Sequence, residues 1–204
     1  MFQDRILSRD EFLRLLKLKS TTLDQRIHIN ETAFAFGLSR PAHIGEYLVL
    51  DAMAMLLASM LHGLAKVQPS RAAEMVRSRW QDWLAGLAQA ERQMNAATSG
   101  QTYFAVGTDY KGNQTAMVGT PKEVNAALEA GGGPFAYASL YFMSLQRVIR
   151  ILRENARQAK IELPKFLTPD PSRDEFDRWL EQVHEFRRIA GIKQQARVKK
   201  KEPA

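Results

Sequence analysis

The side chains best suited to chemistry in this sequence lie close together, between positions 21 and 26. Thr21, Thr22, Gln25 and Arg26 carry hydroxyl, amide and guanidinium groups near the start of a predicted helix. Glutamine can bridge adenine and arginine can bridge guanine in the major groove, while threonine meets a phosphate or a thymine methyl group. Because the first turns of a recognition helix approach the bases, we predict that these side chains contact DNA. An ordinary solvated helix face is the alternative.

Other basic residues could add phosphate contacts to this helix. Lys17 and Lys19 precede it, and Arg40 and His43 lie at the tip of a predicted hairpin. Such side chains hold DNA by its backbone. Residues 1–46 contain seven basic and six acidic residues, so they generate no strong positive field. We therefore expect either that these bases cluster on one face or that another part of the chain adds affinity.

The C-terminus is a second basic feature. Residues 187–204 hold seven basic residues against one acidic residue, in a chain whose formal net charge is +7. A basic tail attracts polyanions through counterion release, whatever their sequence. We predict DNA contact by Lys199, Lys200 and Lys201, and a solvated tail without function is an equal alternative.

Four arginines form a third basic feature. Arg147, Arg150, Arg153 and Arg157 recur at helical spacing and so share one face of a predicted helix. The stripe could be a second nucleic-acid surface. A solvated or salt-bridged face is the more common case.

Signatures of enzymes are absent from the sequence. No two histidines have the i, i+4 spacing of paired metal ligands on a helix. The glycine-bearing loops at 107–112 and 131–133 lack the spacing of phosphate-binding loops. With no cysteine there is neither a disulfide nor a thiolate metal site, which is compatible with a reducing cytoplasm. We predict no enzymatic activity, no metal and no cofactor.

Local signals place the predicted DNA-contacting side chains on a helix-turn-helix. Ser8 and Glu11 have the capping-box spacing, so a helix should begin there. Residues 19–22 offer a hydroxyl N-cap for a second, short helix. Two short helices joined by so tight a turn are typical of a helix-turn-helix.

A hairpin is predicted next. Small and aromatic residues alternate over 32–36, which predicts a strand, and a second strand is expected over 47–50 after a glycine- and proline-bearing loop at 37–45. Asp51 then caps a helix that continues to about Leu64. That helix is apolar on nearly every side and should be buried or paired.

This order of elements resembles the head of MerR-type winged helix-turn-helix regulators over residues 6–66. The signature Tyr47-x-x-Leu50-Asp51, after the predicted wing, carries the resemblance most clearly. The resemblance implies DNA binding by the head and homodimerisation through a long helix that follows it. Asp24, by contrast, lies where a basic residue would favour phosphate contact.

The rest of the sequence, from residue 71 on, predicts further elements with less bearing on function. Apolar residues recur along a predicted helix at 71–97, which indicates either core packing or a dimer seam. A small α+β unit should follow, with strands at 102–107, 114–119 and 136–143 and helices at 120–130 and 145–160. A stiff connector is expected at Pro164, Pro169 and Pro171, and a last helix at 172–189.

Composition supports a folded, soluble protein: 45% of the residues are hydrophobic and 25% are charged. No apolar run is long enough to span a bilayer, and the N-terminus lacks the plan of a signal peptide, so we expect a cytoplasmic location and no membrane.

We therefore predict an α+β fold, mainly α, in four parts: a winged helix-turn-helix head (1–66), a linking helix (67–99), a small hairpin-containing α+β unit (100–163) and a helical, basic C-terminus (164–204). The expected function is sequence-specific binding of double-stranded DNA as a dimeric transcriptional regulator, whose effector ligand is unknown. The first alternative is a structural or assembly protein, such as a phage-type packaging or adaptor component, that uses a similar head for docking. The second, ranked below both, is an enzyme whose site this sequence alone does not reveal.

Overall fold

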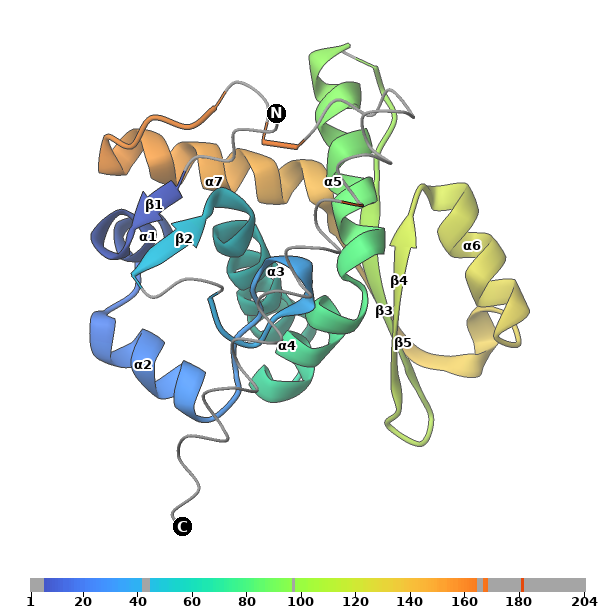
Figure 1. Ribbon diagram of the computed structural model, residues 1–204. Coiled ribbons are helices and arrows are strands. Elements are labelled where there is room, and N and C mark those ends of the chain that lie inside the picture. The colour runs from blue at the N-terminus through green and yellow to red at the C-terminus, as the bar shows by residue number, and fades with distance from the viewer. Residues whose placement is uncertain (1–5, 42–44, 97, 165–166, 169–180, 182–204) are drawn as a thin grey trace. The chain divides into compact units, whose positions relative to one another are not determined.

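A computed structural model of the 204-residue chain describes residues 6–41, 45–96, 98–164, 167, 168 and 181 (Figure 1). The chain divides into two compact units, Gln3–Thr168 and a second unit made of Met1–Phe2 with Pro169–Ala204. The fold described below belongs to the first unit. Several sequence predictions lie outside the described residues: the side chain of His43, the connector prolines at 169 and 171, the helix at 172–189 apart from Glu181, and the lysines of the tail.

Helices dominate the described part of the chain, and the expected α+β class is confirmed. The elements run in the order β1 (Ile6–Ser8), α1 (Arg9–Leu16), α2 (Ser20–His28), the 3₁₀ turn η1 (Ala35–Gly37), β2 (Glu46–Leu48), α3 (Val49–Ala65), α4 (Pro69–Ser78), α5 (Trp80–Asn95), β3 (Tyr103–Asp109), β4 (Gln114–Gly119), α6 (Pro121–Ala130), the 3₁₀ turn η2 (Pro134–Ala136), β5 (Tyr137–Ser144) and α7 (Leu145–Ala159). None of the described helices is both long and apolar enough to cross a membrane.

The capping box predicted at the first helix is present. The Glu11 amide donates to the Ser8 hydroxyl at 3.3 Å, and the Glu11 carboxylate accepts from the Ser8 amide at 2.9 Å. The apolar helix predicted from Asp51 is α3, which begins slightly earlier, at Val49, and is buried along most of its length. Local sequence signals thus predict where α1 and α3 begin, and both helices pack against the rest of the unit.

The predicted hairpin at 32–50 is wrong. Residues 32–36 form no strand: Phe34 makes a single bridge to Leu38, and Phe36 has a left-handed φ of 61° inside η1. β2 pairs instead with β1, in an antiparallel ladder that joins Leu7 to Tyr47. The alternation failed as a signal because every residue from 32 to 36 is buried, so the segment has no solvent face. The two phenylalanines pack in different directions.

The helix predicted over 71–97 is two helices. α4 ends at Ser78, and Arg79, with φ −107° and ψ 26°, separates it from α5. The Trp83 indole donates to the Val76 carbonyl at 2.8 Å across this break. Trp80 and Trp83, in the first turn of α5, are buried in the core of their own chain. The apolar side chains at the start of α5 therefore pack inside this unit.

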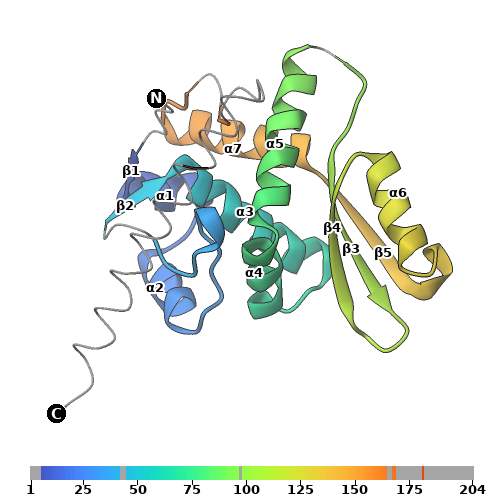
Figure 2. The same ribbon diagram turned by 45° about the vertical axis from the view of Figure 1, so that its right-hand side comes forward.

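The predicted hairpin and third strand form one antiparallel sheet of order β4-β3-β5. The β3–β4 turn is closed by the Asp109 carboxylate, which accepts from the amides of Lys111 and Asn113 at 2.8 Å each. Figure 2 shows α5 on one side of this sheet and α6 on the other. α6 begins with a capping box of Thr120 and Glu123, at the start of the helix predicted over 120–130.

α7 joins this sheet to the N-terminal helices. It follows β5 directly and packs on α1, α3 and α5. The buried Asn155 amide donates to the Leu15 carbonyl at 3.0 Å, and Arg14 donates to the Ala159 carbonyl at 3.2 Å. α1 is therefore held by the C-terminal half of α7. The helix after α1 in the chain, α2, lies at the surface.

Candidate nucleic-acid interface

The candidate interface is the outward face of α2. Leu23 is the one buried residue of this helix, and its other side chains are exposed or half-exposed. In Figure 1, α1 is seen nearly end-on and α2 from the side, so the axes of the two helices diverge. Most helices in proteins are stabilised by a buried apolar face. α2 has a single fully buried side chain, and its exposed face is open to a partner.

The turn between α1 and α2 comprises Lys17, Leu18 and Lys19. Lys17 adopts the left-handed conformation, with φ 55°, and the Leu18 amide donates to the Leu13 carbonyl at 2.9 Å. A left-handed residue after the last helical turn is a common helix ending that satisfies free carbonyl groups. The predicted hydroxyl N-cap of α2 is wrong: Lys19 occupies the N-cap position without a side-chain cap, and Ser20 is the first helical residue.

The α2 acid that would repel phosphate is paired. One Arg9 nitrogen donates to the Asp24 carboxylate at 2.6 Å and to the Ser20 hydroxyl at 3.0 Å, and the other donates to the Tyr47 hydroxyl at 3.3 Å. The hydrogen bond to Asp24 is the main reason why the pKa of Arg9 is raised above its ordinary value. Arg9 thus ties α2 to the start of α1 and to β2, and it compensates the charge of Asp24.

The predicted base-contacting residues share one surface helix. Thr21 and Gln25 are exposed, and Thr22 and Arg26 are half-exposed. Within the described part of the chain, their side chains make no hydrogen bond or ion pair to another residue. Their polar groups therefore face water and are available to a ligand.

The predicted phosphate-contacting residues are more dispersed. Lys19 lies at the start of α2 and is exposed, as is Arg40 in the loop that follows α2. Lys17 points elsewhere, because its amine donates to the Gln158 side chain at the end of α7, at 3.0 Å. Lys19 and Arg40 thus remain as possible backbone contacts among the described residues of this set.

The loop after α2 is held by a buried carboxylate. Asp51 accepts from the Ala35 amide at 2.7 Å and from the Leu48 amide at 2.8 Å, and it is 4% exposed. Burial raises the pKa of Asp51 to about 6, against the opposing effect of these two hydrogen bonds. Arg77 holds the same loop from α4, donating to the Thr32 carbonyl at 2.6 Å. These contacts give the loop a defined shape beside α2.

The arginine stripe of α7 divides into two parts. Arg153 pairs with the buried carboxylate of Glu91 at 2.7 Å, and Arg157 pairs with Glu154 on its own helix. Arg147 and Arg150 are exposed and have no ion pair among the described residues. The salt-bridged interpretation therefore applies to Arg153 and Arg157.

Glu91 is an anchor that the sequence prediction missed. Besides Arg153, its carboxylate accepts from the amides of Leu167 and Thr168, at 3.0 Å, and from the Thr168 hydroxyl at 2.8 Å. A signal was present: Glu91 follows Leu84 and Leu87 at the spacing of the buried face of α5. An acid on an apolar helix face requires donors from elsewhere in the fold.

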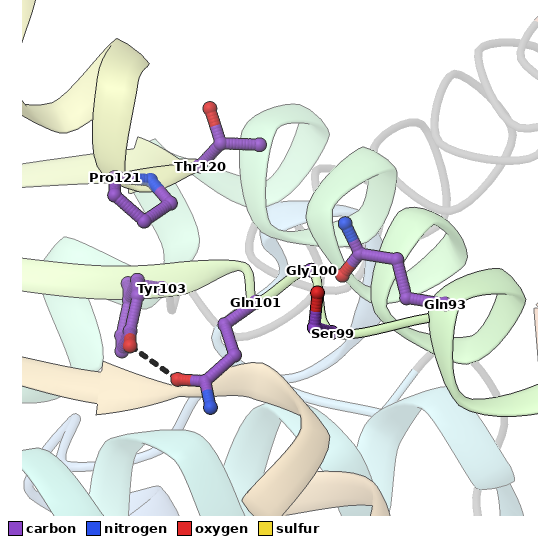
Figure 3. Close-up of a pocket in the computed structure, with 7 residues that line it drawn as sticks. All are labelled: Gln93, Ser99, Gly100, Gln101, Tyr103, Thr120 and Pro121. Atoms are coloured by element: carbon purple, nitrogen blue, oxygen red, sulfur yellow. Dashed lines mark hydrogen bonds between the residues drawn. The ribbon is translucent and has the colours of Figure 1, made fainter. Parts of the chain in front are cut away.

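A polar hollow of about 480 Å³ lies where α5, β3 and α6 meet (Figure 3). Its lining includes Gln93, Tyr103 and Thr120, and the Tyr103 hydroxyl donates to the Gln101 side chain. The buried Gln146 amide holds one of the lining side chains, since it donates to the Gln93 side chain at 2.7 Å and to the Gly100 carbonyl at 3.3 Å. The size is within the usual range for small-molecule sites, but the hollow is open to solvent and most of the residues that line it are polar.

Comparison with protein-family models finds no match, and comparison with curated proteins finds none either. Among the described residues, no three His, Asp or Glu side chains are grouped as metal ligands would be. The chemistry of α2 and its surroundings is therefore the basis for assigning a function.

Proposed function

We propose that this protein binds double-stranded DNA with sequence preference, and that α2 is its recognition helix. The observation that carries the proposal is the combination of a single buried anchor, Leu23, with the polar side chains of Thr21, Gln25 and Arg26, which have no hydrogen-bond or ion-pair partner among the described residues. Amide and guanidinium groups can each make two hydrogen bonds to a base edge, which is how the major groove is read.

Charge supports this assignment. Arg9 neutralises Asp24, so the basic Lys19 and Arg26 determine the local field of α2. Arg40, on the loop between α2 and β2, is available for a backbone contact of the kind that a wing makes. We propose that residues 6–66 act as a winged helix-turn-helix head of MerR type, with this loop in place of the hairpin wing.

A regulator of this kind should select a defined sequence. The test is to enrich duplexes from a random pool with the full-length protein and then to titrate the selected duplex by fluorescence anisotropy. We expect an affinity about a thousandfold above that for random duplex. Arg26→Ala should lose about 1–3 kcal/mol on the selected duplex and should relax selection at one base position. Gln25→Ala should relax selection at another.

Lys122→Ala is the matched control. It removes one positive charge from an exposed position on α6, away from α2, and should leave both affinity and selection nearly unchanged. Equal affinity for every duplex, abolished when residues 187–204 are removed, would reject the proposal. That outcome would favour a structural or assembly protein that holds DNA through its basic tail.

A further inference from the structure

β5 is an edge strand of the sheet, and no other described strand pairs with its outer side. It pairs with β3 over its whole length, from Tyr137 to Ser144. Ala138, Ser139 and Phe142 are exposed, and Figure 2 shows the strand along the edge of the sheet. In an antiparallel ladder, alternate residues direct their N–H and C=O groups away from the paired neighbour. β5 therefore offers a row of backbone donors and acceptors to another strand.

This edge lacks the features that keep natural edge strands from pairing. Charged side chains, prolines, bulges and short length normally protect such strands. β5, with the sequence YASLYFMS, has no charge and no proline, and the one irregularity in its pairing lies at its first residues, opposite Thr108 and Asp109. The interval between Glu129 and Arg147 is the longest in the chain without Asp, Glu, Lys or Arg.

The opposite edge is different. On β4, the Gln114 carbonyl already accepts from the Arg71 guanidinium at 3.3 Å. Val118 of the same strand packs against α5, where a β-carbon added at Gly86 would lie 3.1 Å from it. Arg71 of α4 thus occupies a backbone carbonyl of β4, whereas no side chain of a described element hydrogen-bonds to the backbone of β5.

The side chains next to this edge are apolar on both faces of the sheet. Phe142 is 43% exposed and packs its ring edge-to-face with Tyr103, with ring centroids 5.9 Å apart. Tyr141, the next residue along the strand, points to the opposite face and is half-exposed. A strand added at this edge would cover both aromatic side chains as well as the backbone.

We propose that β5 pairs in antiparallel orientation with β5 of a second copy, so that the sheet continues across a twofold homodimer. An antiparallel pair of identical strands satisfies the same backbone groups in both copies, as a twofold interface requires. Each chain carries a net charge of +7. A neutral edge allows two such chains to approach, whereas contacts through α2 or the arginines of α7 would place like charges together.

With the twofold axis at Leu140, Ser139 lies opposite Tyr141 of the second copy, on one face of the sheet and on each side of the axis. This interface does not depend on DNA binding, and it differs from the helical seam that the MerR resemblance implies. It would also place two α2 helices in one particle, related by the twofold axis of a palindromic site.

The test is sedimentation velocity of the full-length protein over a wide concentration range. We expect a dimer for the unmodified protein and a monomer for the double variant Ser139→Lys with Tyr141→Lys, because lysines then face each other across the axis. Self-association should weaken by roughly 100-fold. The variant Ser139→Glu with Tyr141→Glu should likewise be monomeric. An equimolar mixture of the two variants should recover the dimer, since opposite charges then face each other.

The mixture distinguishes a lost interface from a lost fold, because misfolded chains would not recover pairing. Thr115→Lys, at an exposed position on β4, is the matched control and should leave the dimer intact. A protein that is monomeric at every concentration overturns the proposal. So does a dimer that persists in the double variants, or a mixture that stays monomeric.

Discussion

The Arg9 guanidinium and the Asp24 carboxylate lie 2.6 Å apart and join the first turn of α1 to the exposed helix α2. The same guanidinium reaches the hydroxyl of Tyr47, whose ring stacks on Phe12 with centroids 4.1 Å apart. A chain of contacts therefore runs from the buried aromatic cluster to the proposed recognition helix. Since Leu23 is the one buried residue of α2, Arg9 contributes much of what orients that helix.

Replacing Arg9 with alanine should affect DNA binding more than stability. The two side chains are 36% and 59% exposed, and an exposed ion pair contributes only about 0.2–1 kcal/mol to the free energy of unfolding. Duplex affinity should fall on the order of tenfold, because the unpaired carboxylate of Asp24 then faces phosphate. Urea denaturation and fluorescence anisotropy measure the two effects separately.

Adding Asp24→Asn to this variant should recover most of the affinity, because it removes the exposed charge. Arg79→Ala is the control, since it breaks a comparable exposed pair with Asp82 at the start of α5 and should leave duplex affinity unchanged. If the double variant bound no better than Arg9→Ala, charge compensation at Asp24 would not be the role of Arg9.

Elements with local signals were predictable from the sequence. The capping boxes at Ser8 and Thr120 each join residues three positions apart, and both helices begin where those patterns place them. The β3–β4 hairpin is closed by Asp109 through residues of the same turn. Such interactions form within one short segment, so the residues that make them are neighbours in the sequence as well.

Elements determined by distant contacts were not predictable in the same way. Phe36 lies edge-to-face against Trp80, with centroids 6.1 Å apart, and this contact belongs to a tight turn where alternation predicted a strand. The break at Arg79 interrupts an apolar pattern that continues with helical spacing on both sides.

The candidate site likewise contains residues that could be predicted from the sequence and residues that could not. The polar residues of α2 were found from their types and positions, whereas the role of Arg9 depends on partners 15 and 38 positions away in the chain. No local pattern distinguishes Arg9 from any other basic residue in a first helical turn. Its function in the fold is visible once α1, α2 and β2 are placed together.

Asp51 should make stability depend on pH in a defined direction. Its pKa is about 6 in the folded protein and 3.8 ordinarily, so the folded state binds the proton more tightly. The stabilising contribution of protonation is complete below pH 3.8 and is lost as the pH rises through about 6. The free energy of unfolding should therefore decrease over this window, by up to about 3 kcal/mol from this group.

Asp51→Asn isolates that effect, because the amide does not titrate. The difference in unfolding free energy between the unmodified protein and this variant, measured in urea, should shrink as the pH rises from about 4 to about 7. Gln81→Ala, which removes no titratable group at an exposed position on α5, is the control and should give a nearly constant difference. A constant difference for Asp51→Asn would show that the carboxylate keeps its ordinary pKa.

Two helical glycines should respond in opposite directions to the same substitution. Gly63 lies on α3 with no atom within 4 Å of an added β-carbon. Alanine there should stabilise the protein by about 0.5–1 kcal/mol, because it lowers the entropy of the unfolded chain and favours the helix. The midpoint of urea unfolding should rise without a change in slope.

Gly86, on α5, faces the sheet. An added β-carbon would lie 2.7 Å from Cδ1 of Leu145, 3.1 Å from Cγ1 of Val118 and 3.3 Å from Cγ2 of Thr102. Leucine can rotate away, but the two β-branched side chains are stiff. Gly86→Ala should therefore destabilise the protein by about 1–3 kcal/mol despite its better helix propensity. Combining it with Val118→Ala should cost less than the sum of the two changes, since the second makes room for the first. Equal stabilisation by alanine at Gly63 and Gly86 would mean that α5 does not pack this closely on β4.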